Sequence, residues 1–262
     1  MPDLLTKTLR DGRRGLAGFT AGTALLGVMY AGFYPQVADG AMGQTVHGFS
    51  PALRQALRME DLASAAGYLG SSVFGIIVPL VAVIFGIATG TGAVAGDEEA
   101  GYLDLLLAHP VSRTRLLLHR FAALTVGAIL IAVVVLLAML AVRPAAQLDS
   151  ITVSRFAAQC LALALLIVVF GTVAMTVGAA TGSRPAALAA TTGIAVLTYA
   201  ASTLSSQIGA DALRYISPFH YYIGGEPLRY GFQWADLSIL AATIAVLLTV
   251  AVAAFNRRDL TS

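Results

Sequence analysis

Long apolar runs without a single charged side chain alternate along the chain with short segments that hold its charges. The charge-free runs cover residues 15–38, 62–96, 121–142, 156–183, 185–210 and 237–256. Each reaches the roughly 20 residues that an α-helix needs to cross about 30 Å of hydrocarbon. One Arg or Asp at a bilayer centre costs roughly 2.5–3.5 kcal/mol, so six such exclusions are not accidental. The pattern predicts six transmembrane helices in one membrane domain over 1–262, at about 15–37, 67–90, 119–142, 155–180, 186–205 and 236–255.

The same pattern excludes a membrane β-barrel, because barrel strands alternate polar and apolar residues whereas these runs are apolar on every face. Hydrophobic residues make up 58% of the chain and charged residues 11%. An ordinary soluble domain carries about 25% charged residues. Composition and pattern therefore agree, and both predict an all-α integral membrane protein.

An even number of spans places both termini on one side of the membrane, and the basic residues indicate which side. With the N-terminus inside, ten basic residues fall in the inner segments and six in the outer ones. The inner ones are Lys7, Arg10, Arg13, Arg14, Arg113, Arg115, Arg120, Arg184, Arg257 and Arg258. This excess satisfies the positive-inside rule and predicts cytoplasmic N- and C-termini in a multi-pass protein of the plasma membrane. The net charge of +2 thus reflects orientation, and we expect the lipid membrane, not nucleic acid, as a partner.

Two segments next to the spans have a mixed pattern. Residues 2–14 place Leu5 and Leu9 on one face and basic residues on the other. This predicts an amphipathic interfacial helix, or equally well a simple basic anchor. Residues 206–235 mix apolar and aromatic residues with Gly and Pro, which predicts either a re-entrant segment before the sixth span or an aromatic belt at the membrane surface.

The spans lack the groups that catalysis, metal binding or ion coupling would need. The six runs contain no acidic or basic residue and no histidine, and the four histidines elsewhere have no metal-ligand spacing. The phosphate-binding pattern G-x-x-x-x-G-K-[ST] is absent too, because the single lysine, Lys7, follows Leu5-Thr6. The sequence therefore predicts a protein that is not an enzyme, with no catalytic, metal or cofactor site. If ATP drives it, ATP and Mg²⁺ bind to a partner subunit.

The segment 96–121, between the second and third runs, is unusually rich in charge. Asp97, Glu98 and Glu99 come first, near the start of a helical pattern, where the helix dipole favours negative charge. Pro110 ends that helix, since the residue before a proline avoids the α region. Ser112 suits the N-cap of the next helix, which leads into the third span. The segment is therefore predicted to be a helix–proline–helix elbow.

These residues resemble the first cytoplasmic loop of permease subunits of ATP-binding-cassette exporters of the ABC-2 type. That loop reads approximately E-x-G-T-L-E-L-L-L-A-x-P-V-S-R. The corresponding stretch here is Glu99-Ala-Gly101-Tyr-Leu103-Asp104-Leu-Leu-Leu-Ala108-His-Pro110-Val-Ser-Arg113, with Tyr102 in place of threonine and Asp104 in place of glutamate. The ending Phe255-Asn-Arg257-Arg258-Asp259-Leu260 and the segment Ser217-Pro-Phe-His-Tyr221 are also similar to that family.

The resemblance implies that the loop is a coupling helix seated in a cleft of a separate ATPase subunit. ATP binding would close the ATPase pair and move the elbow between spans two and three. It also implies a second permease subunit, identical or homologous. The implied ATPase-coupling residues are Glu98, Glu99, Gly101, Leu103, Asp104, Pro110 and Arg113.

Three functions are consistent with this sequence. The first is the membrane subunit of an ATP-driven exporter of a hydrophobic or amphipathic small molecule or lipid. The second is an ATPase-coupled scaffold that transmits movement to an extracytoplasmic assembly or maturation step. The third is an ion-coupled carrier, which the lack of a carboxylate within the spans disfavours.

Overall fold

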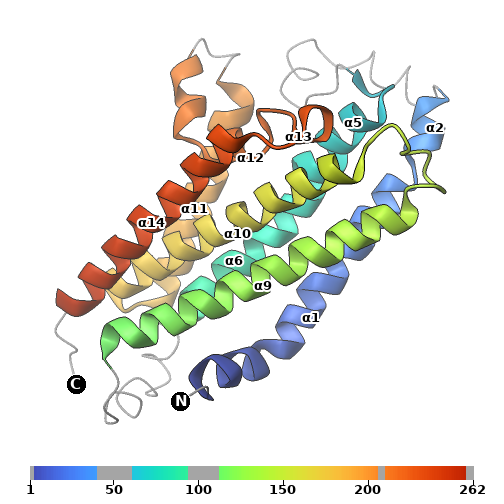
Figure 1. Ribbon diagram of the computed structural model, residues 1–262. Coiled ribbons are helices and arrows are strands. Elements are labelled where there is room, and N and C mark those ends of the chain that lie inside the picture. Colours follow the sequence, from blue (N-terminus) through green and yellow to red (C-terminus); the bar gives the residue numbers. More distant parts are fainter. Residues whose placement is uncertain (1–2, 40–60, 94–111, 206–209, 258–262) are drawn as a thin grey trace.

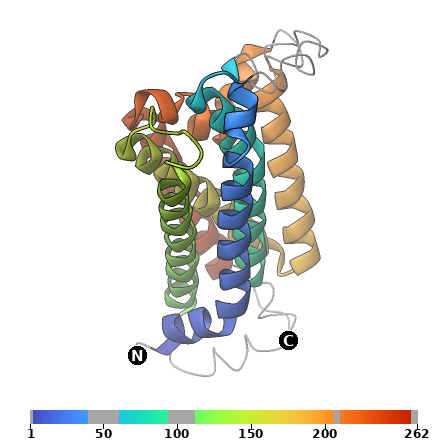
Figure 2. The same ribbon diagram turned by 90° about the vertical axis from the view of Figure 1, so that its right-hand side faces the viewer.

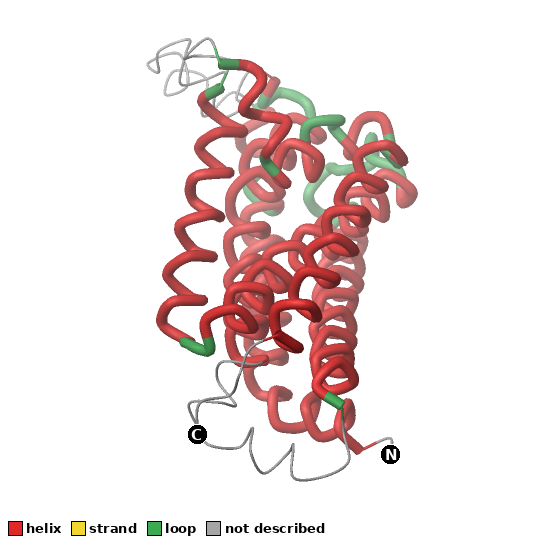
Figure 3. Tube along the Cα trace, turned by 90° about the vertical axis from the view of Figure 1, so that its left-hand side faces the viewer, coloured by secondary structure: helices red, strands yellow, loops and turns green. Residues whose placement is uncertain are grey.

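The computed structural model describes residues 3–39, 61–93, 112–205 and 210–257, and all regular secondary structure in them is helical (Figure 3). The elements are α1 (Asp3–Ala31), α2 (Tyr34–Ala38), α5 (Ala65–Tyr68), the π-helix η2 (Leu69–Ile77), α6 (Val78–Thr91), α9 (Arg113–Val142), α10 (Val153–Thr181), α11 (Arg184–Leu204), the 3₁₀-helix η4 (Asp211–Ile216), α12 (Pro218–Ile223), α13 (Pro227–Tyr230) and α14 (Trp234–Arg257). Six stretches are long and apolar enough to cross a membrane: Gly12–Ala38, Ala65–Thr91, Arg113–Val142, Val153–Thr181, Arg184–Leu204 and Trp234–Arg257. The predictions of an all-helical protein and of six candidate spans are confirmed.

The long helices run roughly side by side between two ends of a bundle (Figure 1). The starts of α1 and α9 and the end of α14 lie at one end, which we call the Arg113 end (Figure 1). Helices α2, α5, α12 and α13 lie at the opposite end, which we call the Arg229 end (Figure 1). The first and last helices of the bundle therefore start and finish at the same end, as an even number of crossings requires.

Helix α10 is the centre of the bundle and packs against α6, α9, α11, α12, α13 and α14. In its most apolar window 72% of the residues are buried, compared with 17% in α11 and 22% in α14. Side chains such as Phe156, Phe170 and Met175 are fully buried along it. Helix α14 packs mainly on α10, whereas α1 lies on the far side of the bundle and packs on α9, α6 and η2.

Glycines bring α6 and α10 into direct backbone contact. A Cβ atom placed on Gly86 would lie 2.5 Å from the carbonyl oxygen of Ile167, and one on Gly90 would overlap the carbonyl oxygen of Gly171. A Cβ atom on Gly171 would in turn lie 2.5 Å from Leu124 of α9. Small residues at a helix crossing allow such an approach, which stabilises helix pairs in lipid by van der Waals contact.

The first predicted span, over 15–37, is divided between two helices. Helix α1 ends at Ala31, and α2 begins at Tyr34 with Pro35 in its first turn. Proline has no N–H group to continue the hydrogen bonding of α1, so the chain makes a turn before the helix resumes. At the other end, α1 has no break from Asp3 onward, so the helix predicted over 2–14 is continuous with the span, and its first turns lie across the Arg113 end (Figures 1 and 2).

The second span contains a π-helix that the sequence analysis does not predict. The nine residues of η2 precede α6, and the N–H group of Val78 donates to the carbonyl of Val73, five residues earlier. Pro79 lies in the first turn of α6, where the wide turns change to ordinary α-helical ones. The missing N–H group of a proline is tolerated at such a position. A Cβ atom on Gly75 would lie 2.5 Å from the carbonyl of Gly70, so the π turns also depend on glycine there.

The segment before the last span, residues 210–233, forms the short helices η4, α12 and α13 at the Arg229 end. Helices α12 and α13 pack on α10, with Phe219 and Tyr222 buried. By contrast, Tyr215 and Tyr230 are exposed. The buried aromatic residues therefore belong to the protein core, whereas the exposed ones are available for a membrane–water interface.

Candidate functional site

The predicted elbow is described by the structure from Ser112 onward. Glu98, Glu99, Gly101, Leu103, Asp104 and Pro110 lie outside the described residues, and Arg113 lies within them. The hydroxyl of Ser112 accepts a hydrogen bond from the N–H group of Arg115 at 3.3 Å and so caps α9. The predicted N-cap is confirmed, and it fixes the start of α9 next to the segment that the sequence analysis singles out.

Arg113 joins the start of α9 to the end of α14. Its guanidinium donates to the carbonyl oxygen of Phe255 at 3.3 Å and lies 5.9 Å from the centre of the Phe255 ring. One residue further along each helix, the amide of Asn256 donates to the hydroxyl of Thr114 at 3.0 Å. Hydrogen bonds and a cation–π contact therefore join the third and sixth spans at the Arg113 end.

Both partners of this junction stand out in the sequence, but the sequence does not show that they lie next to each other. The elbow residue Arg113 and the terminal Phe255-Asn256 pair both belong to stretches with family resemblance, 142 residues apart. Arginine and an aromatic residue at two helix ends are a common pairing for cation–π contact, but one sequence alone does not reveal the proximity. The structure thus connects the predicted elbow residue Arg113 to the end of the sixth span.

A groove of about 290 Å³ runs between α6 and α11 and is almost entirely apolar. Leu80 and Ile84 of α6 and Leu188 and Val196 of α11 line it, and all four side chains are substantially exposed. Helix α11 stands at one side of the bundle (Figure 2). The groove therefore opens on an exposed apolar side of the bundle, and the sequence did not reveal it.

Aromatic residues close the groove toward the Arg229 end. The rings of Tyr199 and Phe219, which both line the groove, are 5.2 Å apart, and the Tyr199 hydroxyl donates to the carbonyl of Gly75 at 3.4 Å. The hydroxyl of Ser217 donates to the carbonyl of Thr198 at 2.7 Å. The segment before the sixth span is thereby fixed against α11 and forms one end of the groove.

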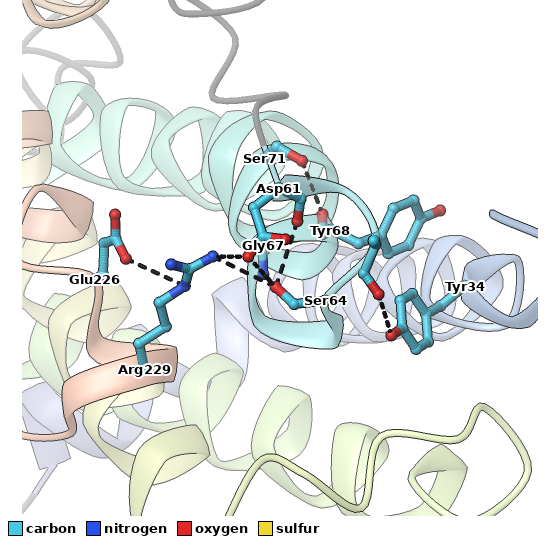
Figure 4. Close-up of polar contacts among 9 residues, drawn as sticks. Tyr34, Asp61, Ser64, Gly67, Tyr68, Ser71, Glu226 and Arg229 are labelled. Carbon is cyan, nitrogen blue, oxygen red and sulfur yellow. Dashed lines mark hydrogen bonds and ion pairs between the residues drawn. The ribbon is translucent and has the colours of Figure 1, made fainter. Parts of the chain in front are cut away.

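A polar cluster lies at the Arg229 end of the bundle (Figure 4). The Arg229 guanidinium pairs with the carboxylate of Asp61 and, at 3.2 Å, with that of Glu226. The hydroxyl of Ser64 donates to Asp61 at 2.5 Å and accepts from the N–H group of Gly67 at 3.1 Å. These bonds hold the start of the second span to the segment before the sixth.

Two tyrosines attach the same region to the end of the first span, and Figure 4 shows the bond made by Tyr34. The hydroxyl of Tyr34 donates to the carbonyl of Ala63 at 2.9 Å, and that of Tyr68 donates to the carbonyl of Tyr30 at 2.9 Å. The two rings lie 5.6 Å apart. The first span, the second span and the segment before the sixth are therefore connected at the Arg229 end by hydrogen bonds and ion pairs, whereas the groove is apolar.

Among residues 3–39, 61–93, 112–205 and 210–257, no group of three His, Cys, Asp or Glu side chains could hold a metal ion. Comparison with protein families gives a match that covers nearly the whole chain: the model described as "ABC-2 family transporter protein" matches residues 4–260. No curated protein matches the chain.

Proposed function

This chain belongs to the ABC-2 family of transporter membrane proteins, and we propose that it forms the membrane path of an ATP-driven exporter for a hydrophobic or amphipathic small molecule or lipid. As a member of that family it is the membrane subunit, a multi-pass protein, and the printed sequence carries no phosphate-binding loop. In this proposal ATP and Mg²⁺ bind to a separate ATPase subunit.

The apolar lining of the groove between α6 and α11 is the observation that supports a hydrophobic cargo. Thr192 and Tyr199 contribute the hydroxyl groups among its lining residues, and the rest of the lining is apolar. An apolar molecule leaving lipid for such a groove exchanges one apolar environment for another, whereas a strongly polar one would lose its hydration without compensation. The exposed apolar rim supports entry of the cargo from the bilayer side.

Filling the groove tests this assignment. Thr192→Trp places a large side chain in the groove from an exposed position of α11. We expect ATP-dependent uptake of a fluorescent phospholipid or hydrophobic dye into inside-out vesicles to fall about tenfold, equivalent to roughly 1.4 kcal/mol. Ile194→Trp is the matched control, because Ile194 is exposed on the same helix and does not line the groove. Equal uptake by the two variants would remove the groove from the transport path.

We further propose that the ATPase docks on the elbow and that the Arg113 end is cytoplasmic. The charge bias of the sequence supports this orientation, and the position of Arg113 supports coupling. The elbow then delivers the movement of the ATPase to α9, and through Phe255 to α14 as well. The coupling residues in this proposal are Glu98, Glu99, Gly101, Leu103, Asp104, Pro110 and Arg113.

A charge reversal in the elbow tests the docking. Glu99→Lys is expected to weaken association with the ATPase about tenfold, because a like charge then faces the surface that accepts the acidic residue. Co-purification and ATP-dependent transport measure the loss, while insertion into the membrane stays intact. The control is Asp39→Lys, which reverses the charge of an exposed carboxylate at the Arg229 end in the same way. Loss of association in both variants, or in neither, would contradict a docking role for Glu99.

A second permease subunit, identical or homologous, completes the proposed path. The low burial of α11 within one chain supports this arrangement, since a partner would cover part of its apolar surface. Light scattering of the purified protein in detergent measures the assembly. A mass of one chain in the presence of the ATPase would contradict it.

A further inference from the structure

A second pocket, of about 260 Å³, lies at the Arg229 end and shares no lining residue with the apolar groove. Its charged lining comes from Asp61, Glu226 and Arg229, which belong to the polar cluster. The amide of Gln159, on the central helix α10, lines it from within the bundle.

Gln159 is the side chain in this pocket that lacks a binding partner. Its exposed fraction is 0%, yet neither its amide nitrogen nor its amide oxygen forms a hydrogen bond in the part of the chain that the structure describes. The hydroxyl of Tyr222 interacts with Gln159 in the core, but the two side chains do not reach the geometry of a hydrogen bond. Buried polar groups in folded proteins are nearly always paired, with protein, water or ligand. The amide therefore offers a donor and an acceptor to whatever occupies the pocket.

The charges in the lining favour a cation. Two carboxylates, of Asp61 and Glu226, face a single guanidinium, and both already pair with it. The cluster keeps one negative charge in excess, so a bound anion would meet net repulsion while an ammonium group would be attracted. Among the small lining residues, Gly70 has open space where a side chain would stand.

We propose that this pocket binds a primary ammonium group that has a hydrogen-bonding oxygen beside it, as in an amino alcohol or an ethanolamine phospholipid headgroup. The carboxylates accept the N–H bonds of the ammonium group, and the orphan amide of Gln159 bonds the neighbouring oxygen and the ammonium group. This site is distinct from the apolar path proposed for the cargo. Its binding does not depend on ATP or on the ATPase subunit.

Thermal unfolding of the purified chain in phosphatidylcholine nanodiscs tests the proposal without transport. Ethanolamine chloride is expected to raise the melting temperature saturably, because a ligand that binds the folded state stabilises it. Choline chloride at the same concentration is expected to have no such effect, since its quaternary ammonium has no N–H donor. In a second arm, nanodiscs of phosphatidylethanolamine replace those of phosphatidylcholine. A rise with free ethanolamine identifies a soluble ligand, and a rise only with the phospholipid identifies a headgroup.

Two variants test whether a rise in melting temperature, with free ethanolamine or with the phospholipid, comes from binding in the pocket. Gln159→Met removes the amide but keeps an unbranched side chain of similar size, and Glu226→Gln removes the excess negative charge. Each is expected to weaken amine binding roughly tenfold. Asp149→Asn is the matched control, because Asp149 pairs with Arg143 in the loop between α9 and α10 and does not line the pocket. Gln159→Met should also unfold close to the wild-type temperature in amine-free nanodiscs, since the amide forms no hydrogen bond of good geometry within the described residues.

The proposal is overturned by the absence of an amine-dependent rise in both lipids, or by a rise that survives both pocket variants. It is overturned as well if Gln159→Met lowers the melting temperature of the amine-free protein and Glu226→Gln leaves amine binding intact, because the amide then has a structural role only. A failure of transport by the wild-type protein would bear on the exporter proposal and leave this binding result unchanged.

Discussion

Gly90→Val is expected to prevent accumulation of the folded protein in the membrane. A Cβ atom at this position would overlap the carbonyl oxygen of Gly171 and lie 2.9 Å from the Cβ atom of Ala174, so α6 and α10 would have to separate. Overpacking in a core costs about 1–3 kcal/mol when side chains can adjust, and more when backbone must move. Since whole proteins are stable by only about 5–15 kcal/mol, the loss of the central helix pair is a large part of the total.

Fluorescence-detected size-exclusion chromatography of a tagged protein measures this outcome, as loss of the folded peak and a lower melting temperature in any protein that remains. The matched control is Gly193→Val in α11, where an added Cβ atom meets nothing within 4 Å. Both variants place a β-branched residue within a membrane helix, so only the packing differs. Equal melting temperatures of the two variants would show that close approach of α6 and α10 is not needed for stability.

Arg113→Ala is expected to separate ATP hydrolysis from transport. The variant loses the hydrogen bond to the Phe255 carbonyl and the contact with the Phe255 ring. A hydrogen bond from a charged donor contributes about 1.5–3 kcal/mol, and a cation–π contact at an exposed site about 0.5–1 kcal/mol. If the junction carries movement into α14, transport falls at least about tenfold while the ATPase still hydrolyses ATP.

The measurement is the number of cargo molecules moved per ATP hydrolysed in proteoliposomes that contain both subunits. Arg115→Ala serves as the control, because Arg115 lies two residues further along α9 and is exposed. Asn256→Ala, which removes the hydrogen bonds with Thr114, should give a partial loss in the same direction. An unchanged ratio in Arg113→Ala would mean that the junction is structural and that coupling runs by another route.

The apolar pattern was sufficient to predict the helical class and the six candidate spans, because each run excludes charge over the full thickness of a membrane. The serine after Pro110 likewise predicted the cap at Ser112. Local geometry was harder to predict. The π-helix over Leu69–Ile77 has the same apolar composition as an α-helix would have, so hydropathy gives no signal for it. The break after Ala31 could have been inferred from Pro35, but the length of the apolar run concealed it.

Contacts between distant segments could not be predicted from one sequence. The pairing of Arg229 with Asp61 joins residues that are 168 positions apart, and the partner of Arg113 is 142 positions away. The groove depends on how far α11 stands from α6, which is a property of packing and not of either helix alone. The resemblance pointed to the family and to the elbow, and the rest of the candidate sites became visible only when the helices were placed in space.

The direct contact between α6 and α10 has a mechanical consequence. At Gly86, Gly90 and Gly171 the backbones of the two helices approach closely, so side-chain rearrangement gives little room for one helix to slide along the other. We therefore expect the two helices to move together, with α6 as the fixed side of the groove. A change in the width of the groove is then expected to come from α11, the least buried of the six spans. The surrounding lipid, or a second subunit, would in that case set how freely α11 tilts.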